Sequence, residues 1–269
     1  MSAGADIRAP SRLARLVAPA LVGILFLILW EAVVRLWTIP PYILPGPLLV
    51  LETLAADGPG LFMALLVTLR ITLAALAVSI LLGGALAILF AQSRLLELSL
   101  FPYAVILQVT PIVAVAPLII IWVNDTFLAL LVCATLVAFF PIVANTTLGL
   151  KSADRNLVEL FRLYGASRWQ ALRYLLLPSA LPNFLVGVRI SGGLALIGAV
   201  VAEFVAGTGG TETGLASRIL EAGYRLEIAR MFAALLLLSL TGIAIFAALS
   251  WLTRRLLAHW HESALAEED

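Results

Sequence analysis

The sequence predicts an all-α membrane protein with six transmembrane helices, and three observations lead to this prediction. Hydrophobic residues make up 62% of the 269 residues and charged residues only 12%, whereas soluble domains have about 45–50% apolar and roughly 25% charged residues. Six stretches hold the roughly 20 apolar residues that a helix needs to cross a hydrocarbon core about 30 Å thick. Basic residues are concentrated in alternate connections between these stretches. We therefore exclude an ordinary cytosolic enzyme and expect residues 1–269 to form one transmembrane domain in a lipid bilayer.

The first predicted span could be mistaken for a secretory signal, because Arg8, Arg12 and Arg15 precede its apolar run. That run continues to Trp37 without a small-residue cleavage site, so we expect an uncleaved helix. The six predicted spans cover residues 17–37, 66–91, 102–122, 127–147, 184–206 and 231–253.

The basic residues also set the predicted orientation, because short cytoplasmic loops collect Lys and Arg. With the N-terminus inside, the inner segments hold eleven of the 17 basic residues and the outer loops hold three. The inner residues are Arg8, Arg12, Arg15, Arg94, Lys151, Arg155, Arg162, Arg168, Arg173, Arg254 and Arg255, the outer ones are Arg218, Arg225 and Arg230, and Arg35, Arg70 and Arg189 lie in or beside helices. Both termini and the loop of residues 151–183 are therefore predicted to be cytoplasmic.

Prolines and small residues add detail to this outline. Four prolines between Ile39 and Pro47 predict a stiff connector before a short interfacial helix at 48–54. Prolines also interrupt the third span, where we expect kinks that serve either helix packing or the lining of a pathway. They are Pro102, Pro111 and Pro117. Small residues at helical spacing in the fifth span, among them Gly187 and Gly198, allow close approach of a neighbouring helix.

The sequence excludes several kinds of chemistry. The only histidines, His259 and His261, lie in the C-terminal tail, so neither Ser-His proteolysis within the membrane nor metal ligation by His is expected. Cys133 is the only cysteine and lies in an apolar run, which excludes disulfides and structural zinc. The sole lysine, Lys151, is not part of a GxxxxGK[ST] phosphate loop, so this chain does not hydrolyse ATP by itself. No basic tract points to nucleic acid.

The cytoplasmic loop contains a short apolar helix. Asp154 or Ser152 is its expected N-cap, and Gly165 is expected to end it. A second helical stretch begins at Ser167 and is expected to end before Pro178, since the residue before a proline disfavours helix. About ten residues are too few to span the bilayer. The apolar side of the first helix must pack either on the protein's own bundle or on a partner, and composition leaves both open.

The residues of this loop resemble the loop signature of binding-protein-dependent ABC importer permeases. That signature is a glutamate and two small residues, three positions, a glycine, nine positions, an aliphatic residue, one position, and Leu-Pro; the chain matches its spacing from Glu159 to Pro178. It departs from it in having Leu and Phe where the family usually has two alanines. The resemblance assigns contact with a partner ATPase to Glu159, Leu160, Phe161, Gly165, Ala166, Ser167 and Pro178.

The resemblance extends over most of the chain, and the chain is similar to the nitrate, sulfonate and taurine branch of these permeases. It is carried by Leu44–Pro47, Pro111–Trp122, Phe140–Pro141 before Asn145, and Ala199–Glu203. It implies the type I ABC importer permease fold with a cytoplasmic coupling helix, in the bacterial inner membrane. Two permease subunits, here expected to form a homodimer, would form the path. Two cytosolic ATPases would bind the ATP, an extracytoplasmic binding protein would deliver the solute, and this chain would carry no cofactor and no catalytic residue.

The solute and the path are less defined. Relatives in this branch take small anions such as nitrate, organosulfonates and taurine, or pyrimidine and flavin-like vitamin precursors. Candidate path residues are polar groups within apolar helices, where an unpaired polar atom is costly, although each could instead bond one helix to another. They are Gln108, Thr110, Asn145 and Glu203.

Two other classes of membrane protein account for the sequence less well. A secondary transporter or channel without an ATPase would usually place several ionisable groups near the middle of the bilayer. Here Glu31, Arg35, Arg70, Arg189 and Glu203 lie near predicted span ends, where snorkelling explains most of them. A scaffold without transport is disfavoured by the loop signature.

Overall fold

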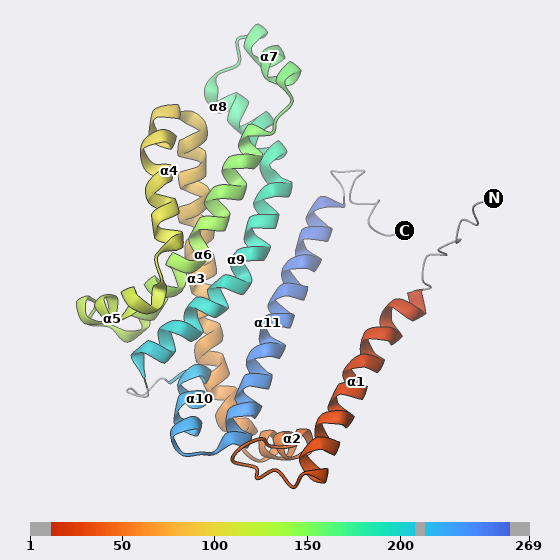
Figure 1. Ribbon diagram of the computed structural model, residues 1–269. Coiled ribbons are helices and arrows are strands. Elements are labelled where there is room, and N and C mark those ends of the chain that lie inside the picture. The colour runs from red at the N-terminus through yellow and green to blue at the C-terminus, as the bar shows by residue number, and fades with distance from the viewer. Residues whose placement is uncertain (1–11, 208–212, 259–269) are drawn as a thin grey trace, which may run out of the picture.

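The computed structural model describes residues 12–207 and 213–258, with side chains from Val17 onward, and within these ranges the regular structure is helical. The elements are α1 (Arg12–Leu36), α2 (Pro47–Ala56), α3 (Gly58–Gln92), α4 (Arg94–Val109), α5 (Ile112–Trp122), α6 (Thr126–Lys151), α7 (Arg155–Leu163), α8 (Arg168–Ala171), the π-helical turn η1 (Leu172–Leu176), α9 (Leu177–Ala206), α10 (Leu215–Tyr224) and α11 (Ile228–Leu257). Figure 1 shows their arrangement. Arg8 and the two histidines lie outside the described residues, as do both chain termini.

In the described part of the chain, five helices are long and apolar enough to cross a membrane, and a bent pair raises the number to six. The prediction of six spans is therefore confirmed when α4 and α5 are counted together. The expectation of one kinked helix over 102–122 is wrong, because α4 and α5 meet at 100°. Thr110 and Pro111 form the break in extended backbone, as expected where a proline pushes the preceding residue out of the helical region. Pro102 and Pro117 remain inside helices.

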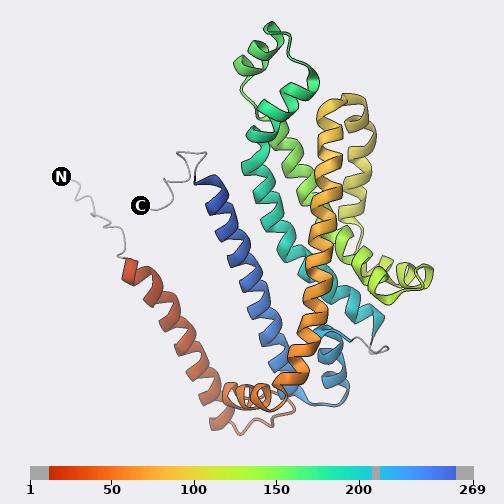
Figure 2. The same ribbon diagram turned by 180° about the vertical axis from the view of Figure 1, so that it is seen from behind.

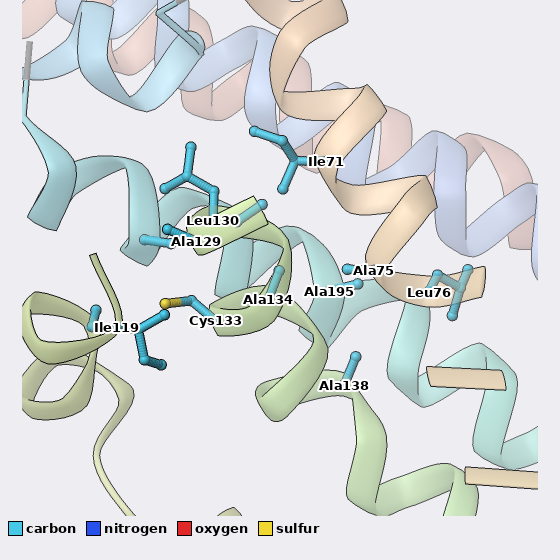
Figure 3. Close-up of a cluster of buried hydrophobic side chains, with 13 residues drawn as sticks. Ile71, Ala75, Leu76, Ile119, Ala129, Leu130, Cys133, Ala134, Ala138 and Ala195 are labelled. Atoms are coloured by element: carbon cyan, nitrogen blue, oxygen red, sulfur yellow. The ribbon is translucent and has the colours of Figure 1, made fainter. Parts of the chain in front are cut away.

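The core lies where α6 packs along α9, with α3 against both. Small side chains dominate this contact, as Figure 3 shows for Ala134 and Ala138 of α6 and Ala195 of α9. A Cβ added at Gly187 would lie 2.9 Å from the Pro141 carbonyl oxygen. The helices therefore approach too closely for any side chain there, which confirms the predicted role of the small residues in the fifth span.

Helix α1 leans away from this bundle and meets it near its C-terminal end (Figures 1 and 2). There the Trp30 ring lies 5.7 Å from the Phe232 ring of α11. The Glu31 carboxylate accepts a hydrogen bond from the backbone N–H of Leu48, 3.2 Å away, in the first turn of the expected interfacial helix α2. Glu31 also pairs with Arg35 at 2.6 Å, so both charges are satisfied at the end of the span.

The two ends of the bundle differ in character. Helix α7 lies at one end with the C-terminal ends of α3, α6 and α11, and we call this the loop end (Figures 1 and 2). Helices α2 and α10 lie at the opposite end, which we call the α10 end, with the N-terminal ends of α3 and α11. The segments that are predicted to be cytoplasmic and basic lie at the loop end.

Candidate functional site

The short helix α7 at the loop end is fixed at its start by a side-chain cap. The Asp154 carboxylate accepts a hydrogen bond from the Asn156 N–H at 2.7 Å, which satisfies one of the donors that a helix N-terminus leaves without a partner. The sequence left Asp154 and Ser152 as alternatives for this cap, and the structure selects Asp154. The Ser152 hydroxyl instead donates to the Gly149 carbonyl at 2.8 Å, at the end of α6.

The end of α7 is a Schellman turn centred on Gly165. The Gly165 N–H donates to the Arg162 carbonyl at 3.0 Å, and the Ala166 N–H donates to the Phe161 carbonyl at 2.9 Å. Gly165 has a φ of +69°, in the left-handed region that favours glycine. The prediction that Gly165 ends this helix is confirmed.

None of the α7 side chains is buried. Leu157, Leu160, Phe161 and Tyr164 recur at helical spacing and form an apolar stripe, whereas Glu159 lies among the charges outside it. Leu160 is 44% exposed and Tyr164 is 83% exposed. Of the two alternatives left open by the sequence, packing on the chain's own bundle is contradicted within the described residues, and an exposed apolar stripe of this kind marks an interaction surface.

The chain returns from α7 to the bundle through an unbroken helical run. Ser167 starts α8 with a capping box, in which its backbone N–H donates to Gln170 Oε1 at 2.7 Å. The expectation that this stretch ends before Pro178 is wrong. The Leu177 N–H bonds to the carbonyl of Leu172, five residues back, so the wider π-helical turn accommodates the proline ring and α9 continues.

The segment that leads from α7 back to the bundle is packed against the bundle, whereas α7 is not. Leu172 and Leu175 are buried, and Leu172 packs with Ala87 of α3 and Leu150 of α6. Of the predicted coupling residues, six therefore lie together from α7 to the start of α8. Pro178 lies apart from them, in the first turn of α9.

An ion-pair cluster lies at the base of the loop. The Lys151 ammonium, on the last residue of α6, pairs with the Glu97 carboxylate of α4. Arg94 approaches the same carboxylate at 3.4 Å. The cluster ties α4 to the point where the loop begins.

We expect a small effect when this cluster is disrupted. Lys151→Glu should lower the stability of the purified protein by no more than about 1 kcal/mol, because partly exposed ion pairs contribute about 0.2–1 kcal/mol. Combination with Glu97→Lys should recover part of the loss. Thermal unfolding in detergent measures the stability of the single and double variants. A double variant whose loss of stability exceeds the sum of the two single losses would contradict the pairing.

A pocket lies at the break between α4 and α5. Its volume is about 340 Å³. Gln108 and Thr110 line it from the break, and Val137 of α6 and Leu194 of α9 line it from the core. Irregular backbone at membrane depth persists only against protein or a water-filled space. The break and the pocket together therefore make this region the best candidate for part of the translocation path. Val137 and Leu194 are apolar residues in apolar helices, so the sequence alone does not mark them as pocket-lining.

The other two candidate path residues lie away from this pocket. The Asn145 side chain donates to the Pro141 carbonyl at 2.8 Å, within α6. Glu203 lies in the last turn of α9 and is only 1% exposed. Its Oε1 accepts from the Thr68 hydroxyl at 2.8 Å, and its Oε2 accepts from the Ala216 N–H at 2.9 Å. Sequence reasoning does not identify Thr68, because it is one of three polar residues close together in α3, with Arg70 and Thr72, and nothing local distinguishes it.

Ion pairs cover the α10 end. Arg218 and Arg225 lie 2.9 Å and 2.8 Å from the Glu221 carboxylate, and Arg230 lies 2.6 Å from Asp57. The hydrogen bond from Arg218 holds the pKa of Glu221 below its usual range, with Arg225 adding to the effect. No group of three or more His, Cys, Asp or Glu suited to a metal ion occurs within residues 12–207 and 213–258.

Comparison with known proteins supplies the class. Residues 79–258 match the family of binding-protein-dependent transport system inner membrane components. The formylaminopyrimidine transport permease of Halalkalibacterium halodurans is 35% identical over 89% of this chain and 94% of its own length. The riboflavin transport permease of Chloroflexus aurantiacus is 37% identical over 89% and 88%, and the taurine transport permease of Escherichia coli is 31% identical over 87% and 86%.

A solved structure supports the fold independently. The crystal structure of an amino acid ABC transporter with histidines superimposes with a TM-score of 0.62 at 18% identity, over 76% of this chain and 97% of that one. The chain therefore belongs to the family of binding-protein-dependent transport system inner membrane components, as a permease subunit of an ABC importer in the sulfonate and taurine-type branch. It is a multi-pass membrane protein with the fold of ABC importer permeases.

Proposed function

We propose that this permease works as a homodimer with two cytosolic ATPase subunits, which dock on α7, and with an extracytoplasmic solute-binding protein, which docks at the α10 end. The observation that carries the proposal is the capped helix α7 with its unburied apolar stripe. Its position beyond the membrane-spanning helices leaves it free for a soluble partner. Glu159, Leu160, Phe161, Gly165, Ala166 and Ser167 make the contact in this proposal, and Pro178 acts through the start of α9.

The docking proposal is tested by a matched pair of substitutions. Tyr164 and Tyr224 end short helices at opposite ends of the molecule and are 83% and 81% exposed. Tyr164→Glu places a charge on the apolar stripe and should abolish co-purification of the ATPase, whereas Tyr224→Glu should retain it. ATPase bound to tagged permease is measured by quantitative immunoblot. Equal retention by both variants would contradict docking on α7.

The proposal also places the loop end and both termini in the cytoplasm. Single cysteines at Ser152 and Leu226, in a Cys133→Ala background, report the two ends. An impermeant thiol reagent applied to spheroplasts should label Leu226→Cys and not Ser152→Cys. The reverse pattern would overturn the orientation.

The solute in this proposal is a small molecule of one of two chemical classes. One is an anion of the nitrate, organosulfonate or taurine type, and the other is a pyrimidine or flavin-like vitamin precursor. The transport functions named for the similar permeases support both classes. Uptake into proteoliposomes that contain the permease alone and no ATP would contradict ATP-driven import.

A further inference from the structure

The carboxylate of Glu203, a residue of α9, lies at the N-terminus of α10. The free backbone N–H groups at that end of a helix are normally bonded by the helix's own N-cap side chain. The N-cap residue of α10 is Gly214, which has no side chain to offer. The Glu203 carboxylate accepts from the Ala216 N–H, and the Thr68 hydroxyl accepts from the Leu215 N–H at 2.8 Å. Residues of α9 and α3 thus satisfy the first donors of α10, and the Glu203 carboxyl group lies at the end of α10 where the helix dipole favours negative charge.

The packing around the carboxylate is equally specific. A Cβ added at Gly214 would overlap the Glu203 carboxylate. The absence of a side chain at 214 therefore allows a carboxylate from another helix to replace the cap. A substitution at this glycine would displace the carboxylate from α10 without changing its charge.

Glu203 also lies at the far end of a long helical run. Residues Arg168–Ala206 form 39 residues of nearly continuous helix, from the capping box that follows α7 to the last turn of α9. At the α10 end, α10 packs on α3, α9 and α11 and is too short to span the membrane. The Glu203 network thus connects this run to α10, and close to it the Ser217 hydroxyl of α10 donates to the carbonyl of Gly207, the C-cap of α9, at 3.1 Å.

We infer that Glu203 is a positioning residue that fastens α10 to α9 and α3, so that a displacement of α7 reaches the α10 end through one continuous body. The inference rests on the proposed function. It differs from a path-lining role, in which Glu203 would contact the solute. In a positioning role, Thr68 and Gly214 matter as much as Glu203 does.

The test uses the complex of permease, ATPase and binding protein reconstituted in proteoliposomes, with uptake and ATP hydrolysis measured on the same preparation. Thr68→Val, Gly214→Ala and Glu203→Gln should each lower the solute transported per ATP hydrolysed by about tenfold, because each removes or displaces buried hydrogen bonds of the Glu203 carboxyl group. The amount of assembled complex and the KM for solute-loaded binding protein should stay unchanged. Thr72→Val is the control, since Thr72 is equally buried but donates within α3, to the Thr68 carbonyl at 2.8 Å.

Several outcomes would overturn the inference. A raised KM in Glu203→Gln alone, with Thr68→Val and Gly214→Ala normal, would show a path-lining residue. Normal transport per ATP in all three variants would show that the network has a purely structural role. This conclusion would hold even if the amount of assembled complex were lower. A defect in Thr72→Val as large as that of Thr68→Val would show a general effect on α3. Failure of the unmodified complex to couple uptake to ATP would contradict the proposed function instead.

Discussion

Gly165→Val is expected to abolish binding-protein-stimulated ATP hydrolysis and uptake together, while the permease still folds and inserts. Gly165 has a φ of +69° in the turn that ends α7, and no atom beyond its two chain neighbours lies within 4 Å of a Cβ added there. The effect of valine is therefore backbone strain and not a clash. Such strain costs about 1–3 kcal/mol for a non-glycine residue. The turn can relieve it only by giving up the hydrogen bonds that orient the apolar stripe.

The control for this prediction is Gly165→Asn, because asparagine tolerates the left-handed region far better than a β-branched residue does. It should retain most of the activity. Glu159→Ala should show a milder loss than valine at 165, since it removes a charge but leaves the turn intact. The measurement is ATP turnover per assembled complex in proteoliposomes. Wild-type turnover and uptake in Gly165→Val would refute the coupling role of this loop.

Gly187→Val is expected to have the largest effect on folding. A Cβ at this position would lie 2.9 Å from the Pro141 carbonyl oxygen and 3.1 Å from the Asn145 Cβ. Neither contact can move without separating α6 from α9, and overpacking of a tight core costs about 1–3 kcal/mol even for small groups. The folded, detergent-soluble permease should therefore be nearly lost.

Gly193→Val tests the same change in the same helix, where no atom other than the chain neighbours and the backbone of α9 itself lies within 4 Å of the added Cβ. Its yield should stay near wild type, because the side chain points into open space and only a small helix-propensity difference remains. Size-exclusion profiles of the two variants compare the folded fractions. Equal yields would show that the α6–α9 approach is looser than described.

Much of the fold follows from patterns that one sequence displays. Long apolar runs predict the spans, and a helix cap needs only a local signal. The sequence therefore predicts the end of α7 at Gly165 and narrows its N-cap to Asp154 or Ser152. The break at Thr110–Pro111 was expected only as a kink, because a proline shows that a helix is disturbed but does not set the angle. The passage through Pro178 was missed because a π-helical turn depends on packing, here through the burial of Leu172.

The candidate site divides in the same way. The apolar stripe of α7 is local and could be read from helical spacing. The Glu203 network brings together Thr68 and Glu203, which are 135 positions apart in sequence. No periodicity connects such residues, and Gly214 shows its role only when the carboxylate of α9 lies against it.

Photo-crosslinking from α7 tests the central claim most directly. A photoreactive phenylalanine analogue at Leu160, on the apolar stripe, should give an adduct between the permease and the ATPase in intact membranes. The same analogue at Tyr224, at the α10 end, should give no ATPase adduct and should instead capture the binding protein. An ATPase adduct from Tyr224, with none from Leu160, would contradict docking on α7.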